Sequence, residues 1–147
     1  QTFKGMPDTE LFTALVGHFS ISGGHTMRKN IKIGERELPF EANLGTTRLY
    51  EKLTGKNILN LMVNFKNNPE ISAGVQMLDV FIKLAYVMNT QANCETIEEM
   101  MNRMTEEQEL EWECQFDLAD FNEKVLTELG SLFGSTQKTH SEAAEKN

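Results

Sequence analysis

The chain has 147 residues, of which 39 % are hydrophobic, and a formal net charge of −8. This length suits one domain whose core is stable without disulfides or metal. Residues 95–128 hold twelve acidic side chains against Arg103 and Lys124, whereas residues 1–94 hold eight acidic and ten basic ones. We expect this local acidic block to be a solvated helix face, and it argues against nucleic-acid binding. No stretch reaches the roughly 20 apolar residues of a membrane helix.

Residues 1–26 are predicted to stand apart from the rest of the chain. The segment ends in Ser-Gly-Gly-His-Thr, the composition of a flexible linker, and Met27 follows as a candidate start of the domain. Within it Leu11, Leu15 and Phe19 recur at helical spacing, so that one apolar stripe could lie in a groove. Three interpretations stay open: a natural extension, an appended tag, and a tethered or fused partner peptide.

Residues 30–42 have the pattern of a β-hairpin. Polar and apolar residues alternate over 30–33, a Gly-Glu pair can turn the chain, and an extended run resumes over 38–42. Pro39 has no amide hydrogen for a central ladder, so we expect it at a sheet edge or at a strand start.

Two short helices are predicted next. In the first, over residues 46–54, the apolar side chains share one face, and Gly55 stands at the C-terminal stop. Asn57 can cap the second, whose apolar residues recur at helical spacing until Pro69 interrupts the pattern.

The longest helical pattern covers residues 69–91, with Asn68 as its cap and Pro69 in its first turn. Apolar side chains form two stripes along it, one of Ile71, Val75, Leu78, Ile82 and Ala85, and one of Met77, Phe81, Leu84 and Met88. Such coverage predicts a central helix that is packed on several sides.

Capping signals predict further helix starts in the acidic block. Thr96 is followed by Glu99, and Thr105 by Gln108, each at the spacing of a capping box. Residues 110–116 alternate with period two, which contradicts a helix there, so their conformation stays open.

Asp117 is predicted to cap the last helix, which would end near Gly134. Residues 135–147 are polar and are expected to form a disordered tail. The sequence therefore predicts a mainly α protein, a small helical domain over residues 27–134 with an N-terminal β-hairpin.

No combination of residues predicts a catalytic, cofactor-binding or metal site. The glutamates at 95–107 lack the spacing and the glycine of a calcium loop, and the Gly-Lys pair at Gly55 lacks the upstream glycine of a phosphate-binding loop. Cys94 and Cys114 have no CxxC spacing and are predicted to be free thiols in a reducing compartment. An enzyme is not expected.

The eight methionines indicate a surface that binds an irregular apolar partner, because unbranched thioethers adapt their shape. Three of them stand beside the acidic block. Met62, Met77 and Met88 fit core filling as an alternative. The candidate client-binding residues are Met100, Met101, Met104, Trp112 and Phe116.

Several motifs follow one another in a definite order along residues 27–147. The hairpin ends in Phe-Glu-Ala-Asn-Leu, and the first helix carries Tyr-Glu-Lys-Leu-Thr-Gly-Lys at 50–56, the most specific of these motifs. A long apolar helix closes on Leu-Ala-Tyr-Val-Met, an acidic Thr-capped helix follows, and Phe121 and Val125 precede a Lys/Thr/Ser tail. This order resembles the tail assembly chaperones of long-tailed bacteriophages that infect Gram-positive bacteria.

The resemblance implies a protein of the host cell cytoplasm that binds the long, helical tape measure protein and keeps it soluble. It implies release as tail tube subunits, the major tail protein, polymerise around that client, so that the chaperone is not retained in the mature virion. Further implied partners are a longer form made by ribosomal frameshifting and a second copy of the chain. Neither nucleic acid, a membrane nor a cofactor is implied.

An acidic decoy is the alternative function. The acidic block could imitate nucleic acid and bind a host nucleic-acid-binding protein. Such binding would be lost in moderate salt, because exposed charges are screened beyond a Debye length of about 10 Å at about 0.1 M.

Overall fold

The computed structural model describes residues 27–68, 70 and 74–145, with only the backbone for residues 136–145. The predicted N-terminal segment, residues 1–26, lies outside the described residues. The described chain is mainly helical and begins with a β-hairpin, as predicted. None of its helices is both long and apolar enough to cross a membrane.

Strands β1 (Met27–Ile33) and β2 (Arg36–Ala42) form the predicted antiparallel hairpin. Gly34 in the turn has a φ of 66°, which glycine adopts without strain. Pro39 pairs with Asn30 in a two-stranded sheet, where it interrupts no central ladder, as predicted. The side chains of one face are buried: Ile31, Ile33, Phe40 and Ala42.

Helices α2 (Gly45–Thr54) and α3 (Ile58–Asn67) are the two predicted short helices. Gly55 ends α2 with a φ of 76°, the left-handed conformation expected at this stop. The side chain of Asn57 accepts a hydrogen bond from the Asn60 amide at 3.0 Å, which confirms the predicted cap of α3.

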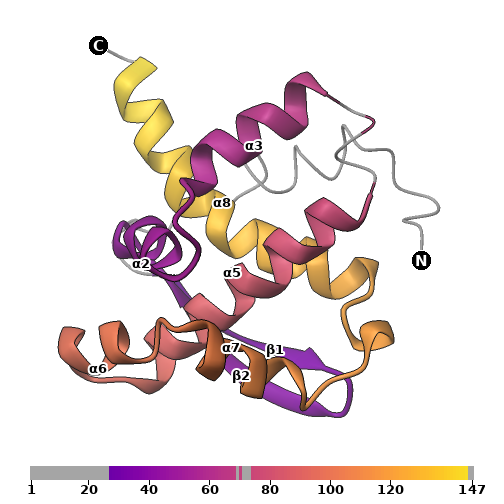
Figure 1. Ribbon diagram of the computed structural model, residues 1–147. Coiled ribbons are helices and arrows are strands. Elements are labelled where there is room, and N and C mark those ends of the chain that lie inside the picture. Colours follow the sequence, from indigo (N-terminus) through magenta and orange to yellow (C-terminus); the bar gives the residue numbers. More distant parts are fainter. Residues whose placement is uncertain (1–26, 69, 71–73, 146–147) are drawn as a thin grey trace.

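Helix α5 (Val75–Asn93) crosses the middle of the molecule, with the hairpin below it and α3 above it (Figure 1). One predicted stripe is fully buried: Met77, Phe81, Leu84 and Met88. The other is buried only in part, because Val75 is exposed and Leu78 is half-buried. The predicted continuous helix from Pro69 is wrong: Gly74, with ψ at −165°, is extended, and α5 begins after it. Residues 69 and 71–73 lie outside the described part.

Helix α6 (Ile97–Asn102) begins with the predicted capping box of Thr96 and Glu99. Helix α7 (Glu106–Glu113) has the predicted Thr105 cap, although the Gln108 side chain donates to a backbone carbonyl instead of completing the box. The segment whose conformation the sequence left open is therefore helical up to Glu113. Its period-two pattern misleads because α7 buries Trp112 and leaves Leu110 exposed.

Asp117 caps the 3-10 helix η1 (Leu118–Asp120) and not the last helix. Helix α8 (Glu123–Glu145) starts after Asn122, whose side chain accepts from the Val125 amide at 3.1 Å. The predicted end near Gly134 is also wrong. Gly134 is buried within α8. The backbone stays helical through residues 135–145, which were predicted to be a disordered tail. Glu, Ala and Lys residues in this segment favour a helix.

Candidate partner-binding groove

The five predicted client-binding residues do not form one surface. Met104, 3 % exposed, and Trp112, 7 % exposed, belong to the hydrophobic core, so the prediction that they bind a client is wrong. Phe116 is half-buried and packs against the core. Only Met100 and Met101 line an open groove.

Trp112 is buried because it has partners from α5 and from the two segments that flank η1. Its indole N–H donates to Asn89 Oδ1 at 3.0 Å. Its ring lies 5.6 Å from that of Tyr86, 4.9 Å from that of Phe116 and 6.2 Å from that of Phe121, measured between centroids. Aromatic pairs at such distances favour edge-to-face packing. These contacts hold α7 on α5 and remove the indole from any binding surface.

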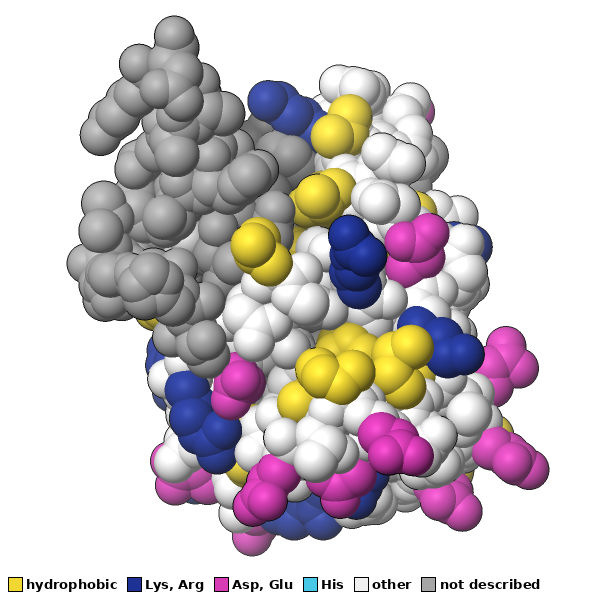
Figure 2. Space-filling view, turned by 90° about the vertical axis from the view of Figure 1, so that its left-hand side faces the viewer, with side chains coloured by type: hydrophobic (Ala, Val, Ile, Leu, Met, Phe, Trp, Pro, Cys, Tyr) yellow, Lys and Arg dark blue, Asp and Glu magenta, His cyan; other side chains and the backbone are white. Residues whose placement is uncertain are grey.

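Met100 and Met101 line a groove of about 510 Å³ between α2 and α6. Leu49 from α2 contributes a buried wall, whereas Ile97, 68 % exposed, and Met101, 40 % exposed, stand open to solvent on α6. The face that carries these two helices is seen in Figure 2, where hydrophobic side chains gather in the lower half between basic and acidic ones. The groove therefore offers apolar surface with a charged border.

Polar groups at one end of the groove are hydrogen-bonded to one another. The Thr46 hydroxyl donates to Gln91 Oε1 at 2.6 Å, and Gln91 Nε2 donates to Asn43 Oδ1 at 2.9 Å. The Gly45 amide donates to the same Asn43 oxygen at 2.8 Å. Because these groups satisfy one another, a partner gains mainly apolar contacts from this groove.

The two sides of the groove differ in charge. Arg48 and Lys52 line it from α2, together with Glu51, whereas α6 carries exposed Glu98 and Glu99. The α2 side thus carries both signs of charge, whereas the exposed charged side chains of α6 are acidic. The backbone N–H groups of residues 95 and 96 hold the pKa of the Glu99 carboxyl below its usual value. Glu99 therefore remains an anion that caps α6.

Helix α6 is attached to the core mainly at its C-terminal end. None of its six residues is buried, whereas Met104 directly after it is. The Tyr86 hydroxyl donates to the Arg103 carbonyl at 2.6 Å. Burial raises the pKa of this tyrosine, so its hydroxyl stays protonated. On the groove-facing side of α6, Met100 packs partly against the core, whereas Ile97 and Met101 are exposed.

The sequence did not single out Leu49, Ile97, Arg48 or Lys52 as groove residues. A signal existed for Ile97, because it follows the Thr96 cap directly and is the apolar residue of an otherwise acidic first turn. Leu49 was predicted on the apolar face of the first short helix, α2. The spacing of apolar residues predicts that this face is buried, but it does not predict which other helix packs against it.

Among the described residues, no group of three or more His, Cys, Asp or Glu side chains is placed to hold a metal ion. Cys94 and Cys114 are both free, as predicted, and burial raises the pKa of the Cys94 thiol.

Comparisons of the chain with protein-family models, curated proteins and solved structures find no match.

Proposed function

We propose that this protein is a phage tail assembly chaperone that binds a helical segment of the tape measure protein in the groove between α2 and α6. The observation that carries the proposal is the open apolar surface of Ile97, Met100 and Met101. An amphipathic helix binds such a groove by laying the apolar side chains of one face into it.

The chemistry of the groove suits a client that presents different segments in turn. Met100 and Met101 have flexible thioether side chains, which fit irregular apolar surfaces at small energetic cost. Ile97 and Met101 are exposed, so their side chains can change conformation to fit clients of different width. Positive and negative side chains at the border keep the complex hydrated.

In this proposal the chaperone shields the apolar stripes of its client in the host cell cytoplasm until tail tube subunits polymerise around it. The longer frameshifted form and a second copy of the chain are further proposed partners. Shielding needs contact area and not catalysis, which is consistent with a groove of apolar side chains.

The proposal is tested by co-expression with the tape measure protein of the same genome. The double variant Ile97→Ser/Met101→Ser removes two exposed apolar side chains of the groove, whereas Leu110→Ser/Leu118→Ser removes two outside it. We expect the groove variant to leave most of the client in the pellet and the control variant to solubilise it as the wild type does. Met104 is left unchanged because it is buried.

Equal solubilisation by the two double variants would contradict the proposed groove. An insoluble client at a molar excess of wild-type chain, with no complex on a sizing column, would contradict the chaperone function itself. A tail tube subunit alone serves as the negative control.

The acidic decoy is the second candidate, because Glu98, Glu106 and Glu107 are exposed together on α6 and α7. Its binding would weaken steeply with salt, whereas apolar contacts in the groove persist. Sizing columns run in low and in moderate salt therefore separate the two functions.

A further inference from the structure

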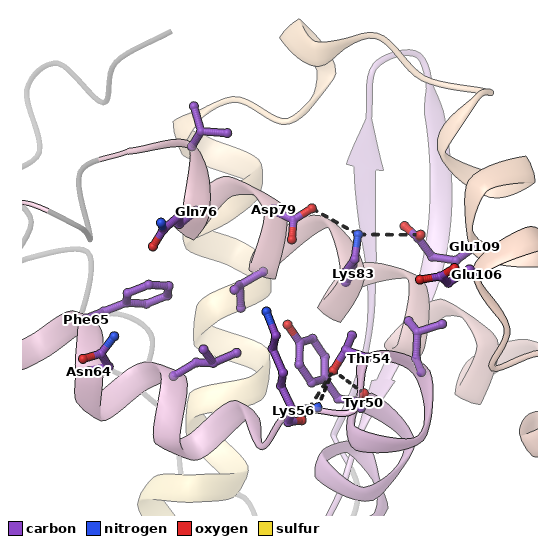
Figure 3. Close-up of a pocket in the computed structure, with 14 residues that line it drawn as sticks. Tyr50, Thr54, Lys56, Asn64, Phe65, Gln76, Asp79, Lys83, Glu106 and Glu109 are labelled. Carbon is purple, nitrogen blue, oxygen red and sulfur yellow. Dashed lines mark hydrogen bonds and ion pairs between the residues drawn. The ribbon is translucent and has the colours of Figure 1, made fainter.

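A second cavity, of about 590 Å³, lies among α2, α3, α5 and α7 and shares no lining residue with the α2–α6 groove. Figure 3 shows it, with Phe65 at one end and Glu109 at the other. Apolar and charged side chains both line this cleft. The apolar ones include Leu53, Leu61, Phe65 and Val80, and the charged ones include Asp79, Lys83, Glu106 and Glu109.

Lys83 is shared by three carboxylates at the charged end of the cleft. Its Nζ lies 3.1 Å from Asp79 Oδ1, 3.7 Å from Glu109 Oε1 and 3.7 Å from Glu113 Oε2. Of the three, only Asp79 is within hydrogen-bond distance. The Lys83 ammonium thus faces three carboxylates. Lys56 also lines the cleft, so that in all two ammonium groups stand against the four carboxylates of Asp79, Glu106, Glu109 and Glu113. A further cation is therefore electrostatically favoured here.

Glu109 is the most confined of these carboxylates. The residue is only 5 % exposed, although the sequence placed it in a solvated acidic block, so that expectation is wrong for this position. Figure 3 shows its carboxylate directed toward Lys83. Its second oxygen, Oε2, is buried and has no hydrogen-bond partner among the described residues. Buried carboxylate oxygens are normally paired, and leaving one unpaired is costly.

We propose that this cleft binds an alkylammonium group whose alkyl chain lies against Leu53, Leu61 and Phe65. Glu109 Oε2 is closed to solvent in this structure, so the carboxylate turns toward the cleft when the ammonium donates a hydrogen bond to it. A lysine side chain of a partner protein and a free amine share this chemistry. Charge-assisted hydrogen bonds to carboxylates are stronger than neutral ones, and long cationic side chains bury their stems on apolar surface. A divalent metal ion fits less well, because the apolar side chains Leu53, Leu61 and Phe65 offer it no oxygen ligands, whereas they fit an alkyl chain.

The test is a titration of the full chain with n-butylammonium and with Nα-acetyl-lysine N-methylamide, followed by amide chemical shifts in NMR. The neutral alcohol n-butanol has the same chain length without the charge and serves as the ligand control. We expect Glu109→Gln to weaken binding of both amines about tenfold, since a charged acceptor becomes neutral. Glu107→Gln removes the same charge from an exposed site of α7 outside the cleft and should bind as the wild type does.

A second variant keeps the test independent of how Glu109→Gln folds. Asp79 is exposed, and Asp79→Asn leaves Lys83 free to move toward Glu109, so amine binding should weaken here as well. Tighter binding of the lysine derivative than of butylammonium indicates a protein side chain as the ligand, and equal binding indicates a free amine. Amines that cause no saturable shifts, butanol that binds equally well, or equal affinities of the Glu107 and Glu109 variants would overturn the proposal.

Discussion

The indole N–H of Trp112 donates a hydrogen bond to Asn89 Oδ1 at 3.0 Å, across 23 positions of the chain. The amide nitrogen of Asn89 donates in turn to the Pro39 carbonyl at 2.8 Å. Asn89 is buried, so one polar side chain joins α7, α5 and β2 inside the core. This link joins α7 through α5 to the hairpin, and Glu106 and Glu109 of α7 line the cleft among α2, α3, α5 and α7.

Asn89→Leu should lower the free energy of unfolding by about 2–4 kcal/mol, because it leaves the Trp112 N–H and the Pro39 carbonyl buried without partners. Urea denaturation followed by Trp112 fluorescence measures this loss. Asn93→Leu on the exposed end of the same helix is the control and should change stability by less than about 0.5 kcal/mol. A loss at Asn89 no larger than at Asn93 would show that the link contributes nothing.

Phe81→Ala should cost about 3–5 kcal/mol, the range for emptying a fully packed aromatic site. Leu78 belongs to the other predicted apolar stripe of the same helix. The structure separates the two, since Leu78 is only half-buried, and we expect Leu78→Ala to cost less than half as much. Denaturant midpoints of the two variants give the comparison, and equal losses would contradict the position of α5 in the core.

Gly34→Ala and Gly55→Ala place a methyl group on two glycines with positive φ, 66° and 76°. The backbone strain of about 1–2 kcal/mol is common to both. At Gly34 the added carbon would also lie 2.8 Å from Asp120 Oδ1, whereas nothing lies within 4 Å at Gly55. The Asp120 carboxylate accepts from the Asp117 amide, so its displacement disturbs η1.

We therefore expect Gly34→Ala to be the more destabilising of the two substitutions, measured by thermal unfolding. Asp120→Ala combined with Gly34→Ala should remove the difference between the two glycines. Persistence of that difference in the double variant would contradict a steric origin.

Thr96→Ala should destabilise the start of α6 by about 1 kcal/mol through loss of the helix cap. The pKa of the Glu99 carboxyl, which the backbone N–H groups of residues 95 and 96 hold below its usual value, should rise toward that value in this variant. An NMR titration of the Glu99 carboxyl carbon measures its pKa in the wild type and in the Thr96→Ala variant. An unchanged pKa would show that the cap and the carboxylate act independently.

The direction of the pH dependence follows from the lowered pKa of Glu99 in the folded chain. The stabilisation of α6 by this carboxylate is fully present above the pKa of the unfolded chain and is lost as the pH falls through the lower folded pKa. Acid should therefore loosen α6 at its N-terminal end, next to the groove residue Ile97. In the Glu99→Gln variant, the stability of the N-terminal end of α6 should no longer depend on pH in this range.

Local structure could be predicted from the sequence because its causes lie within a few residues. The Gly-Glu turn of the hairpin, the Asn57 and Thr96 caps and the Gly55 stop each depend on contacts between near neighbours, and each is found where it was predicted. The wrong boundaries have a local cause as well. The chain offers two caps close together, Asp117 and Asn122, and the sequence pattern does not say which one starts the long helix.

Only the tertiary structure decided which apolar and acidic side chains remain accessible. Met101 and Met104 stand three positions apart in the same Met-rich stretch, yet one is open to solvent and the other is buried. Glu109 and Trp112 are buried by packing of α7 against α5, and the partners Lys83 and Asn89 lie more than twenty positions away. Periodicity reports which face of a helix is apolar, whereas exposure depends on whether a distant segment covers that face.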